Sequence, residues 1–237
     1  MGRVFRRLLV TVAVVGVLAG CSDGGPTERP RADESATNAV AAAEKSAPPS
    51  ASRSMPPSAS APAAAPRYVF PVDGRNSYAR EHHDYPASDI IAACGTVVRA
   101  VTDGVVLEVS RVDTFDKATS GGGDRGGLSV SMVGDDGVRY YGSHFSVIDP
   151  VVQPGVRVAA GSRLGLVGKT GNANNTCHLH LGISPACART ADWWVRRGVV
   201  WPWPYLDAWK AGQPRSPVAE VSAWQAGHGC PSQAPDN

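Results

Sequence analysis

Between Arg67 and Ala188 the sequence consists of short runs of β-forming residues separated by frequent turn signals, and no helical period of apolar residues persists there. The turns fall at Asp103-Gly104, Asp135-Asp136-Gly137, Pro154-Gly155 and Ala160-Gly161. Strands are predicted over 96–101, 104–112, 128–133, 138–141, 156–158, 164–167 and 178–183. This pattern predicts an all-β fold, a compact antiparallel β-sheet domain with long loops.

The first residues have the features of an export signal. Arginines precede the apolar run 8–18, which is shorter than the roughly 20 residues that span a bilayer but suits a secretory signal. The run ends in Leu18-Ala19-Gly20-Cys21, which resembles the lipobox of bacterial lipoproteins. We therefore expect a signal peptide over 1–20 and a lipid on Cys21 that anchors the protein at the outer face of the cell membrane. The alternative is an ordinary signal peptide with a chance cysteine.

Composition divides the rest of the chain. Residues 21–66 are rich in Ala, Pro and Ser and contain no aromatic residue, so they cannot bury enough apolar surface to offset the entropy of ordering. We predict a disordered tether over 21–66, a domain over 67–211 and a C-terminal tail over 212–237. All six tryptophans lie between Trp193 and Trp224, where they either pack the tail onto the domain or form a stacking wall for a ligand.

The charge balance excludes polyanion binding. The formal net charge is +2, and three of the basic residues lie in the expected signal peptide. Without them Lys and Arg fall from 23 to 20, against 21 acidic residues. We therefore expect no nucleic-acid partner, and we expect a monomer.

Five cysteines are present, and lipidation of Cys21 would leave four: Cys94, Cys177, Cys187 and Cys230. An even number in an exported domain indicates two disulfides. We expect the pairs Cys177–Cys187 and Cys94–Cys230, because the first closes a short loop. Metal binding by cysteine is disfavoured because no Cys-x-x-Cys pair exists.

Histidines are concentrated at three places in the predicted β domain. In His178-Leu179-His180 both imidazoles would project from the same face of a strand. Upstream, the segment from His82 and His83 to Asp89 combines imidazole with a carboxylate. Two nitrogens and one carboxylate oxygen, with a water at the fourth position, describe an open catalytic zinc site.

These residues resemble the lysostaphin/LytM-type zinc endopeptidases that cut peptidoglycan, a family with the duplicated hybrid motif fold. The family pattern is a His, a short gap and an Asp, then an aromatic-x-His, then a final His-x-His. The matching segments are His83 to Asp89, Tyr140-Tyr141-Gly142-Ser143-His144 and His178-Leu179-His180. The resemblance covers residues 67–190 and implies a groove lined by the long loops.

The resemblance implies a role for each residue. His83, Asp89 and His180 would bind Zn²⁺, His178 would orient or deprotonate the attacking water, and His144 would stabilise the oxyanion or assist proton transfer. The gap before Asp89 is longer than in the commonest family form, so His82 remains an alternative to His83.

The resulting hypothesis is a lipid-anchored zinc endopeptidase that hydrolyses stem peptides or cross-links of peptidoglycan during cell-wall remodelling. The alternatives are a non-catalytic module that binds the wall or activates another hydrolase, and a lipoprotein that delivers metal.

Overall fold

The structure is a computed structural model that describes residues 67–187 and 192–234. The predicted signal peptide over 1–20, the lipidation site Cys21 and the tether over 21–66 lie outside the described residues. No helix in the described ranges combines the length and apolar character needed to cross a membrane.

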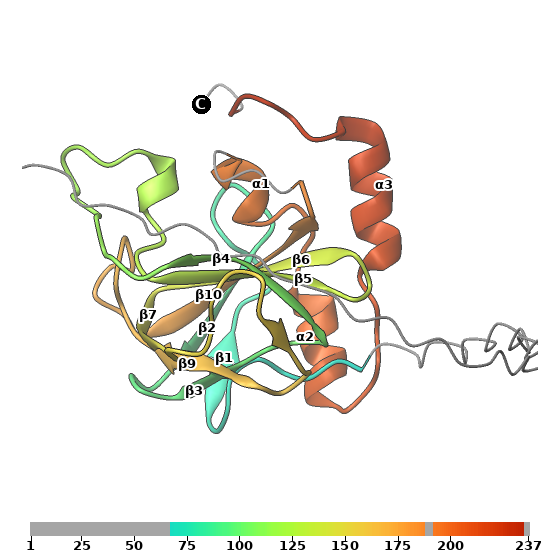
Figure 1. Cartoon of the computed structure of the whole chain (residues 1–237), viewed down its shortest axis with the longest axis horizontal. Coiled ribbons are helices and arrows are strands. Elements are labelled where there is room, and N and C mark those ends of the chain that lie inside the picture. Colours follow the sequence, from blue (N-terminus) through green and yellow to red (C-terminus); the bar gives the residue numbers. More distant parts are fainter. Residues whose placement is uncertain (1–66, 188–191, 235–237) are drawn as a thin grey trace, which may run out of the picture. The chain divides into compact units, whose positions relative to one another are not determined.

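The domain is built from two antiparallel sheets (Figure 1). The larger sheet has seven strands in the order β1-β2-β10-β6-β5-β4-β8, and the smaller has the order β3-β9-β7. The strands are β1 (Asn76–Tyr78), β2 (Ser88–Ala92), β3 (Val97–Arg99), β4 (Gly104–Ser110), β5 (Ser129–Gly134), β6 (Val138–Ser143), β7 (Phe145–Ile148), β8 (Arg157–Val158), β9 (Arg163–Val167) and β10 (His178–Pro185). The predicted all-β class is confirmed.

Each of the seven predicted runs contains a strand, but β1, β2 and β7 were not predicted. β1 has only three residues, and β2 places the polar Asp89 beside buried neighbours, so neither shows clear alternation. No turn residue marks the start of β7, because the chain passes from β6 to β7 through His144 alone. These gaps matter because β2 and the β6–β7 junction both contribute to the site described below.

Helices occupy the C-terminal part of the chain. They are α1 (Trp193–Arg196), α2 (Trp203–Lys210) and α3 (Val218–His228), and a 3₁₀ turn, η1 (Gly122–Asp124), lies in a glycine-rich loop. α2 has a proline in its first turn, where the missing N–H would have no helical partner. α3 lies within the segment expected to be a tail, and its Val221 is buried in the core.

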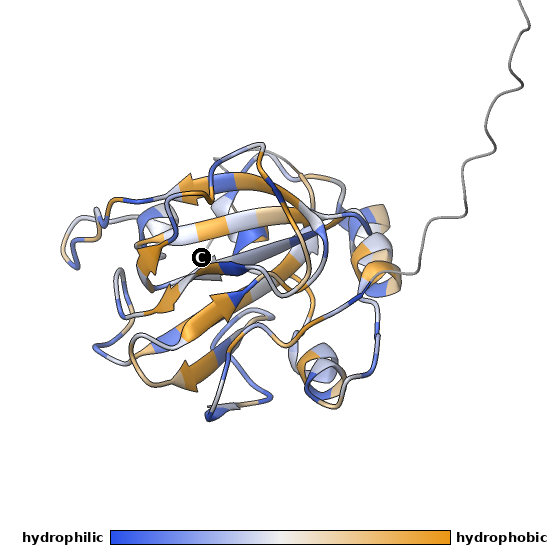
Figure 2. Cartoon of the chain, turned by 60° about the horizontal axis from the view of Figure 1, so that its bottom comes forward, coloured by the Kyte–Doolittle hydropathy of each residue, from blue (hydrophilic) through white to orange (hydrophobic). Residues whose placement is uncertain are grey.

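Hydrophobic residues are concentrated along the strands, and hydrophilic residues are frequent in the connecting loops (Figure 2). Every residue of β10 is buried, because this strand lies between β2 and β6 and is covered by α1 and α3. Leu179 and Leu181 pack in the core, which leaves the histidines of the same strand on its opposite face.

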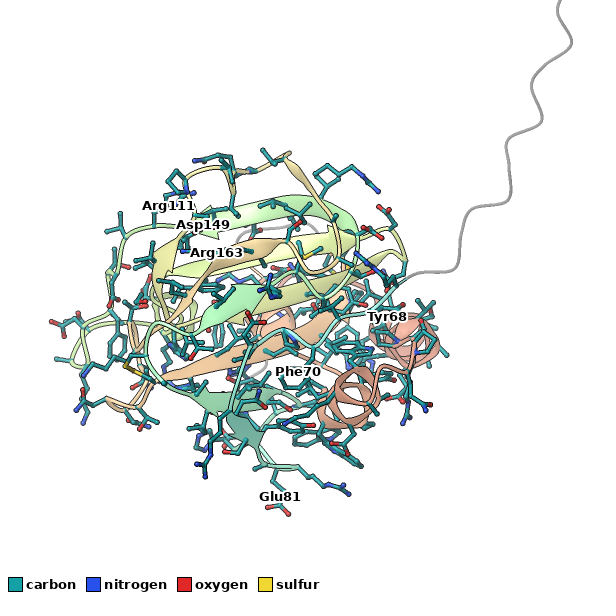
Figure 3. The ribbon with its side chains drawn as sticks, turned by 90° about the horizontal axis from the view of Figure 1, so that it is seen from below. Tyr68, Phe70, Glu81, Arg111, Asp149 and Arg163 are labelled. Atoms are coloured by element: carbon teal, nitrogen blue, oxygen red, sulfur yellow. A yellow bond between two sulfur atoms is a disulfide. The ribbon has the colours of Figure 1, made fainter. Side chains whose placement is uncertain are left out.

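An aromatic cluster attaches α2 to the start of the domain. The ring of Trp209 stacks on Tyr68 with centroids 5.4 Å apart and also contacts Tyr140 and Tyr205. The hydroxyls of Tyr68 and Tyr140 both donate to the carboxylate of Asp136, at 2.8 and 2.6 Å. Figure 3 shows Tyr68 beside the C-terminal helices. Trp209 therefore packs the C-terminal part of the chain onto the domain, one of the two roles expected for the tryptophans.

A polar cluster fixes loops at another part of the domain, where Figure 3 shows Arg111, Asp149 and Arg163 together. Arg163 pairs with the Asp149 carboxylate at 3.2 Å, and Arg111 donates to the Asp149 carbonyl at 3.0 Å. None of these three residues lines the cavity that contains the histidines, and their contacts hold neighbouring loops together.

The predicted disulfide pairing was wrong. The structure pairs Cys94 with Cys177 and Cys187 with Cys230, with Cα–Cα distances of 5.3 and 5.6 Å. Cys177 and Cys187 flank β10, and a strand rises about 3.3 Å per residue, so they lie more than roughly 20 Å apart, far beyond disulfide range. The short loop in sequence is a fully extended strand in space.

We expect peptide mapping of the non-reduced protein to recover linked peptides containing Cys94 with Cys177 and Cys187 with Cys230. Mass spectrometry before and after reduction would identify them. Recovery of a Cys177–Cys187 peptide from the folded protein would contradict the strand geometry.

A buried ion pair holds α1 against the large sheet. Arg139 on β6 is fully buried and forms two hydrogen bonds to Asp192, at 3.1 and 2.9 Å, and a third to the Ser184 hydroxyl at 3.1 Å. Asp192 directly precedes α1 and is itself buried. Removal of the carboxylate would leave the guanidinium charge buried without a counterion.

We expect Asp192→Ala to lower the free energy of unfolding by about 3–5 kcal/mol, measured by denaturant titration. The matched control is Asp135→Ala, which breaks the solvent-exposed pair of Asp135 with Arg157 and should have a much smaller effect. Equal losses in the two variants would contradict the role assigned to the buried pair.

Candidate metal centre

The register of three strands brings the predicted site residues together. β10 lies between β2 and β6, so that His180 is directly opposite Asp89 on one side and Ser143 on the other. His178 and His180 project from the same face, as the sequence predicts, and both are buried. His144 follows Ser143, and its ring centroid lies 4.6 Å from that of His178.

His144 has an unusual backbone conformation. Its φ angle is 68°, in the left-handed region that non-glycine residues rarely adopt, and its N–H donates to the carbonyl of Gly126 at 3.0 Å. The conformation occurs where the chain leaves β6 in the large sheet and enters β7 in the small one. Such strain is typical of positions where a side chain must point into a site.

The loop before β2 supplies two adjacent histidines. Ligand atoms of His82, His83 and Asp89 all lie within 4.8 Å of one another, so each histidine can join a carboxylate-containing metal site. His82 is buried, its Nε2 lies 3.6 Å from the Asp89 carboxylate, and its ring centroid is 5.0 Å from that of His180. His83 is exposed and contacts the ring of His82. His82 is thus the buried member of the pair, whereas the family resemblance implies His83 as the ligand.

Four backbone carbonyls orient four imidazole rings. The Nδ1 atoms of His82, His144 and His178 lie 3.3, 2.7 and 2.9 Å from the carbonyls of Tyr85, Thr170 and Thr176, and His180 Nε2 lies 2.9 Å from that of Arg197. A carbonyl can only accept, so each of these nitrogens must carry the proton. The other nitrogen of each ring is then free to act as a ligand or base.

The contact between His180 and Asp89 indicates whether a cation would fit between these two residues. His180 Nδ1 lies 3.0 Å from the Asp89 carboxylate while Nε2 donates to the carbonyl of Arg197. A neutral ring would therefore place a lone pair against an anionic oxygen, so the contact requires either a second proton on His180 or a metal cation. The Nε2 atoms of His82 and His178 lie 3.6 and 3.8 Å from the same oxygen. Nitrogen and carboxylate ligands in this number suit Zn²⁺.

Burial and mutual repulsion keep the surrounding rings neutral. Burial, with further contributions from His180 and His178, lowers the pKa of His144 to about 4. Burial, together with His180, also lowers the pKa of His82. For Asp89, burial acts to raise the pKa, but the hydrogen bond and positive charge of His180 outweigh it and hold the pKa well below its usual range. Neutral imidazoles and an ionised carboxylate are the forms that bind metal.

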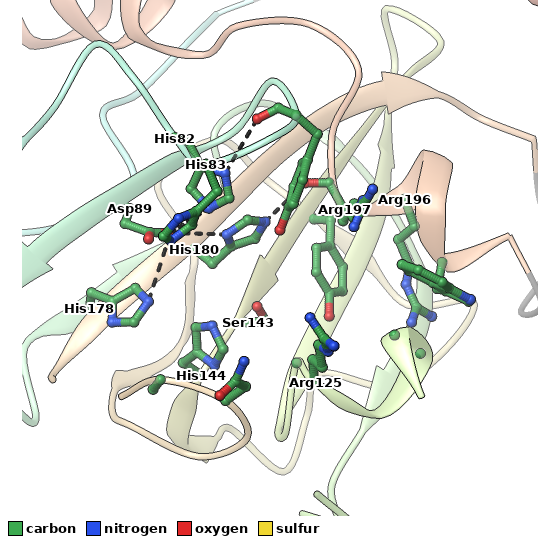
Figure 4. Close-up of a pocket in the computed structure, with 18 of the residues that line it drawn as sticks. His82, His83, Asp89, Arg125, Ser143, His144, His178, His180, Arg196 and Arg197 are labelled. Carbon is green, nitrogen blue, oxygen red and sulfur yellow. Dashed lines mark hydrogen bonds and ion pairs between the residues drawn. The ribbon is translucent and has the colours of Figure 1, made fainter. Parts of the chain in front are cut away.

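The histidines line a cavity of about 330 Å³ (Figure 4). All five positions of the family motif line it, together with the alternative His82. The cysteines do not contribute to the cavity lining, although Cys177 immediately precedes His178 and its disulfide joins the start of β10 to Cys94, which follows β2.

Sequence reasoning missed several residues of the cavity wall, namely Tyr85, Arg125, Trp193, Arg196 and Arg197. Trp193 carried the only available signal, since the tryptophan cluster left open a wall that stacks on a ligand. No motif marks the arginines, because they come from the glycine-rich loop and from the end of α1, which reach the site only in the folded chain.

Comparisons with known proteins agree with the sequence motifs. Residues 83–191 match the model of Peptidase family M23. The catalytic domain of lysostaphin from Staphylococcus simulans has a TM-score of 0.43 and 22% identity, over 56% of this chain and 92% of that one. A putative glycyl-glycine endopeptidase LytM from Ruminococcus gnavus ATCC 29149 has a TM-score of 0.47 and 22% identity, over 62% of each chain.

A zinc-containing peptidase from Vibrio cholerae has a TM-score of 0.41 and 20% identity, over 56% of this chain and 38% of that one. This chain therefore spans less than two thirds of the Ruminococcus and Vibrio proteins. No curated protein matches the chain.

The two neighbouring histidines can be distinguished by metal affinity. We expect His82→Ala to weaken zinc binding by about 100-fold or more, since loss of an orienting partner alone costs 10–100-fold. His83→Ala should weaken it far less. Competition with a chromophoric chelator measures both affinities, and His180→Ala serves as the positive control. The reverse order would identify His83 as the ligand.

Proposed function

We propose, from the match of residues 83–191 to the model of Peptidase family M23, that the chain is a zinc-dependent endopeptidase of peptidoglycan. Its substrates would be peptide bonds in the stem peptides or cross-links of the cell wall. The observation that carries the proposal is the convergence of Asp89 and four carbonyl-oriented histidines in one cavity.

We assign the metal to His82, Asp89 and His180, with His83 as the alternative to His82. Bound there, zinc would lower the pKa of a coordinated water and polarise a peptide carbonyl. The three ligands come from β10, β2 and the loop before β2, so the site is assembled across strands and leaves one side open to the cavity. The Arg197 carbonyl keeps His180 Nδ1 facing Asp89.

His178 is assigned as the general base. Its Nδ1–H donates to the Thr176 carbonyl at 2.9 Å, which leaves Nε2 unprotonated and directed toward the Asp89 carboxylate at 3.8 Å. A water held near the ligands would lie within reach of this nitrogen, which would accept its proton.

His144 is assigned to proton transfer and charge stabilisation. Its Nδ1–H donates to Thr170, so in the neutral ring Nε2 is an acceptor. It can donate to an oxyanion or to a leaving amine only after taking up a proton. Burial lowers the pKa of His144 to about 4. The protonated ring would therefore be a stronger acid than an ordinary imidazolium and would readily donate its proton to a leaving amine. Of the two roles suggested by the family resemblance, proton transfer has the stronger support.

The disulfides support an extracytoplasmic location, since such bonds persist mainly in exported proteins. Anchoring through Cys21 remains a proposal from the lipobox-like segment. A tether over 21–66 would hold the domain away from the membrane and allow it to reach peptidoglycan.

Activity separates the proposed enzyme from a non-catalytic wall-binding module. We expect zinc-loaded protein to release muropeptides from purified peptidoglycan, measured by chromatography and mass spectrometry. His144→Ala should bind zinc normally but lower kcat by about 10²–10³-fold, because it removes a proton-transfer group. His178→Ala should show a similar loss.

The matched control is His228→Ala, which removes an exposed histidine on α3. It should leave the rate unchanged. Full activity in the folded, zinc-loaded His144→Ala variant would exclude its assigned role. Wall binding without any cleavage by the zinc-loaded wild type would instead indicate a binding or activating module.

A further inference from the structure

Three arginines line one wall of the cavity that contains the histidines: Arg125, Arg196 and Arg197 (Figure 4). They come from two separate parts of the chain, since Arg125 follows η1 and the other two lie at the end of α1. These guanidinium groups therefore line the same cavity as the histidines of the candidate metal centre. Their chemistry bears on which peptides the site accepts.

Arg196 already has an acidic partner. Its Nη1 bonds to the Glu108 carboxylate at 2.9 Å, and its guanidinium packs 5.0 Å from the ring centroid of Tyr141. Both members of this pair are largely buried. The pair braces α1 against β4 and leaves Arg196 with little net charge to offer a ligand.

Arg197 has no such partner among residues 67–187 and 192–234. Its guanidinium packs on Tyr85 at 3.8 Å and on Trp193 at 5.0 Å, and its buried Nε has no hydrogen-bond acceptor in the described part of the chain. Stacking uses the face of the guanidinium, whereas its donors lie in the plane. Arg197 is thus held in place with its hydrogen-bonding capacity unused.

Arg125 adds a second positive charge nearby. It is exposed and forms no ion pair with any described residue. Arg125 and Arg197 line the same cavity. Asp84 is exposed and does not reach ion-pair distance from Arg197. Two like charges without a close counterion form a binding site for an anion.

Arg197 is also coupled to the metal centre. Its own carbonyl accepts from His180, and the Tyr85 ring on which its guanidinium stacks lies 6.0 Å from the His180 ring. The next residue, Gly198, has φ +131°, and a Cβ there would lie 2.2 Å from the Pro86 carbonyl. The backbone beside Arg197 is therefore packed tightly against the loop that carries His82 and His83, and the ring contacts hold the guanidinium near the same loop.

We propose that Arg197, together with Arg125, binds a free carboxylate of the peptide substrate close to the bond that is cut. This rests on the proposed endopeptidase function and specifies its substrate class. The enzyme would prefer peptides with a carboxylate beside the scissile bond over neutral peptides, such as amidated stems or all-glycine bridges. A guanidinium matches a carboxylate through two parallel hydrogen bonds, which lysine cannot form.

The test uses one cross-linked muropeptide in two forms, with its carboxylates free and with the same carboxylates converted to carboxamides. We expect the full chain, loaded with zinc, to cleave the free form with a kcat/KM about tenfold to hundredfold higher, the usual effect of a charge-assisted hydrogen bond. Arg197→Gln and Arg125→Gln should each reduce this ratio, mainly by raising KM for the free form. Arg197→Lys should restore only part of it.

The matched control is Arg75→Gln, which removes the same charge from an exposed position outside the cavity. It should preserve the preference. Zinc content and thermal unfolding of each variant check that Arg197→Gln leaves the metal centre intact, and Arg125→Gln tests the proposal at an exposed side chain whose loss should not disturb folding.

Binding separates failure of this proposal from failure of the proposed function. The His144→Ala variant should bind the free muropeptide about tenfold or more tightly than the amidated one in calorimetry, even if the wild type cleaves neither. Absence of cleavage with this preference retained would overturn only the enzymatic assignment. The carboxylate site would be overturned if both muropeptide forms bound and were cleaved equally. It would also be overturned if the preference for the free form survived in the Arg125→Gln/Arg197→Gln double variant.

Discussion

His180 lies between the Asp89 carboxylate and the Arg197 carbonyl, and this placement determines how the rest of the site is arranged. The carbonyl takes the proton of one ring nitrogen, so the other must face the carboxylate. That contact is stable only with a positive charge at its centre. His82 and His178 approach the same carboxylate oxygen with their own free nitrogens. A single cross-strand pair thus defines a position for a cation that the neighbouring rings share.

The backbone supplies the orientation of every histidine at the centre. Carbonyls from loop residues Tyr85, Thr170, Thr176 and Arg197 each fix one ring. In many metal sites a side-chain carboxylate accepts the N–H of the histidine, but here Asp89 is itself assigned as a metal ligand. The arrangement makes the chemistry depend on loop conformation. The left-handed backbone of His144, its bond to Gly126 and the Cys94–Cys177 disulfide beside His178 all hold those loops.

The C-terminal part of the chain contributes to the site as well as to stability. Asp192 pairs with the buried Arg139, which places α1 on the sheet and brings Arg197 to the cavity. The disulfide from Cys187 to Cys230 then connects the end of β10 to the residues that follow α3. Arg197, the residue after α1, provides the His180 acceptor and a guanidinium with no acidic partner among residues 67–187 and 192–234. The proposed metal binding and substrate preference would therefore depend on the same element.

The sequence by itself determined the all-β class and the positions of most strands, since turn residues and alternation are local properties. It also determined that His178 and His180 share a face, because side chains in a strand alternate with a period of two. Tertiary structure decided what depends on pairing between distant segments. The register of β2 on β10 placed Asp89 opposite His180, the fold buried His82 and left His83 exposed, and the extended β10 separated two cysteines that are near in sequence. The arginine wall arises only when α1 packs beside the glycine-rich loop, a contact between segments about 70 residues apart that leaves no local pattern to read.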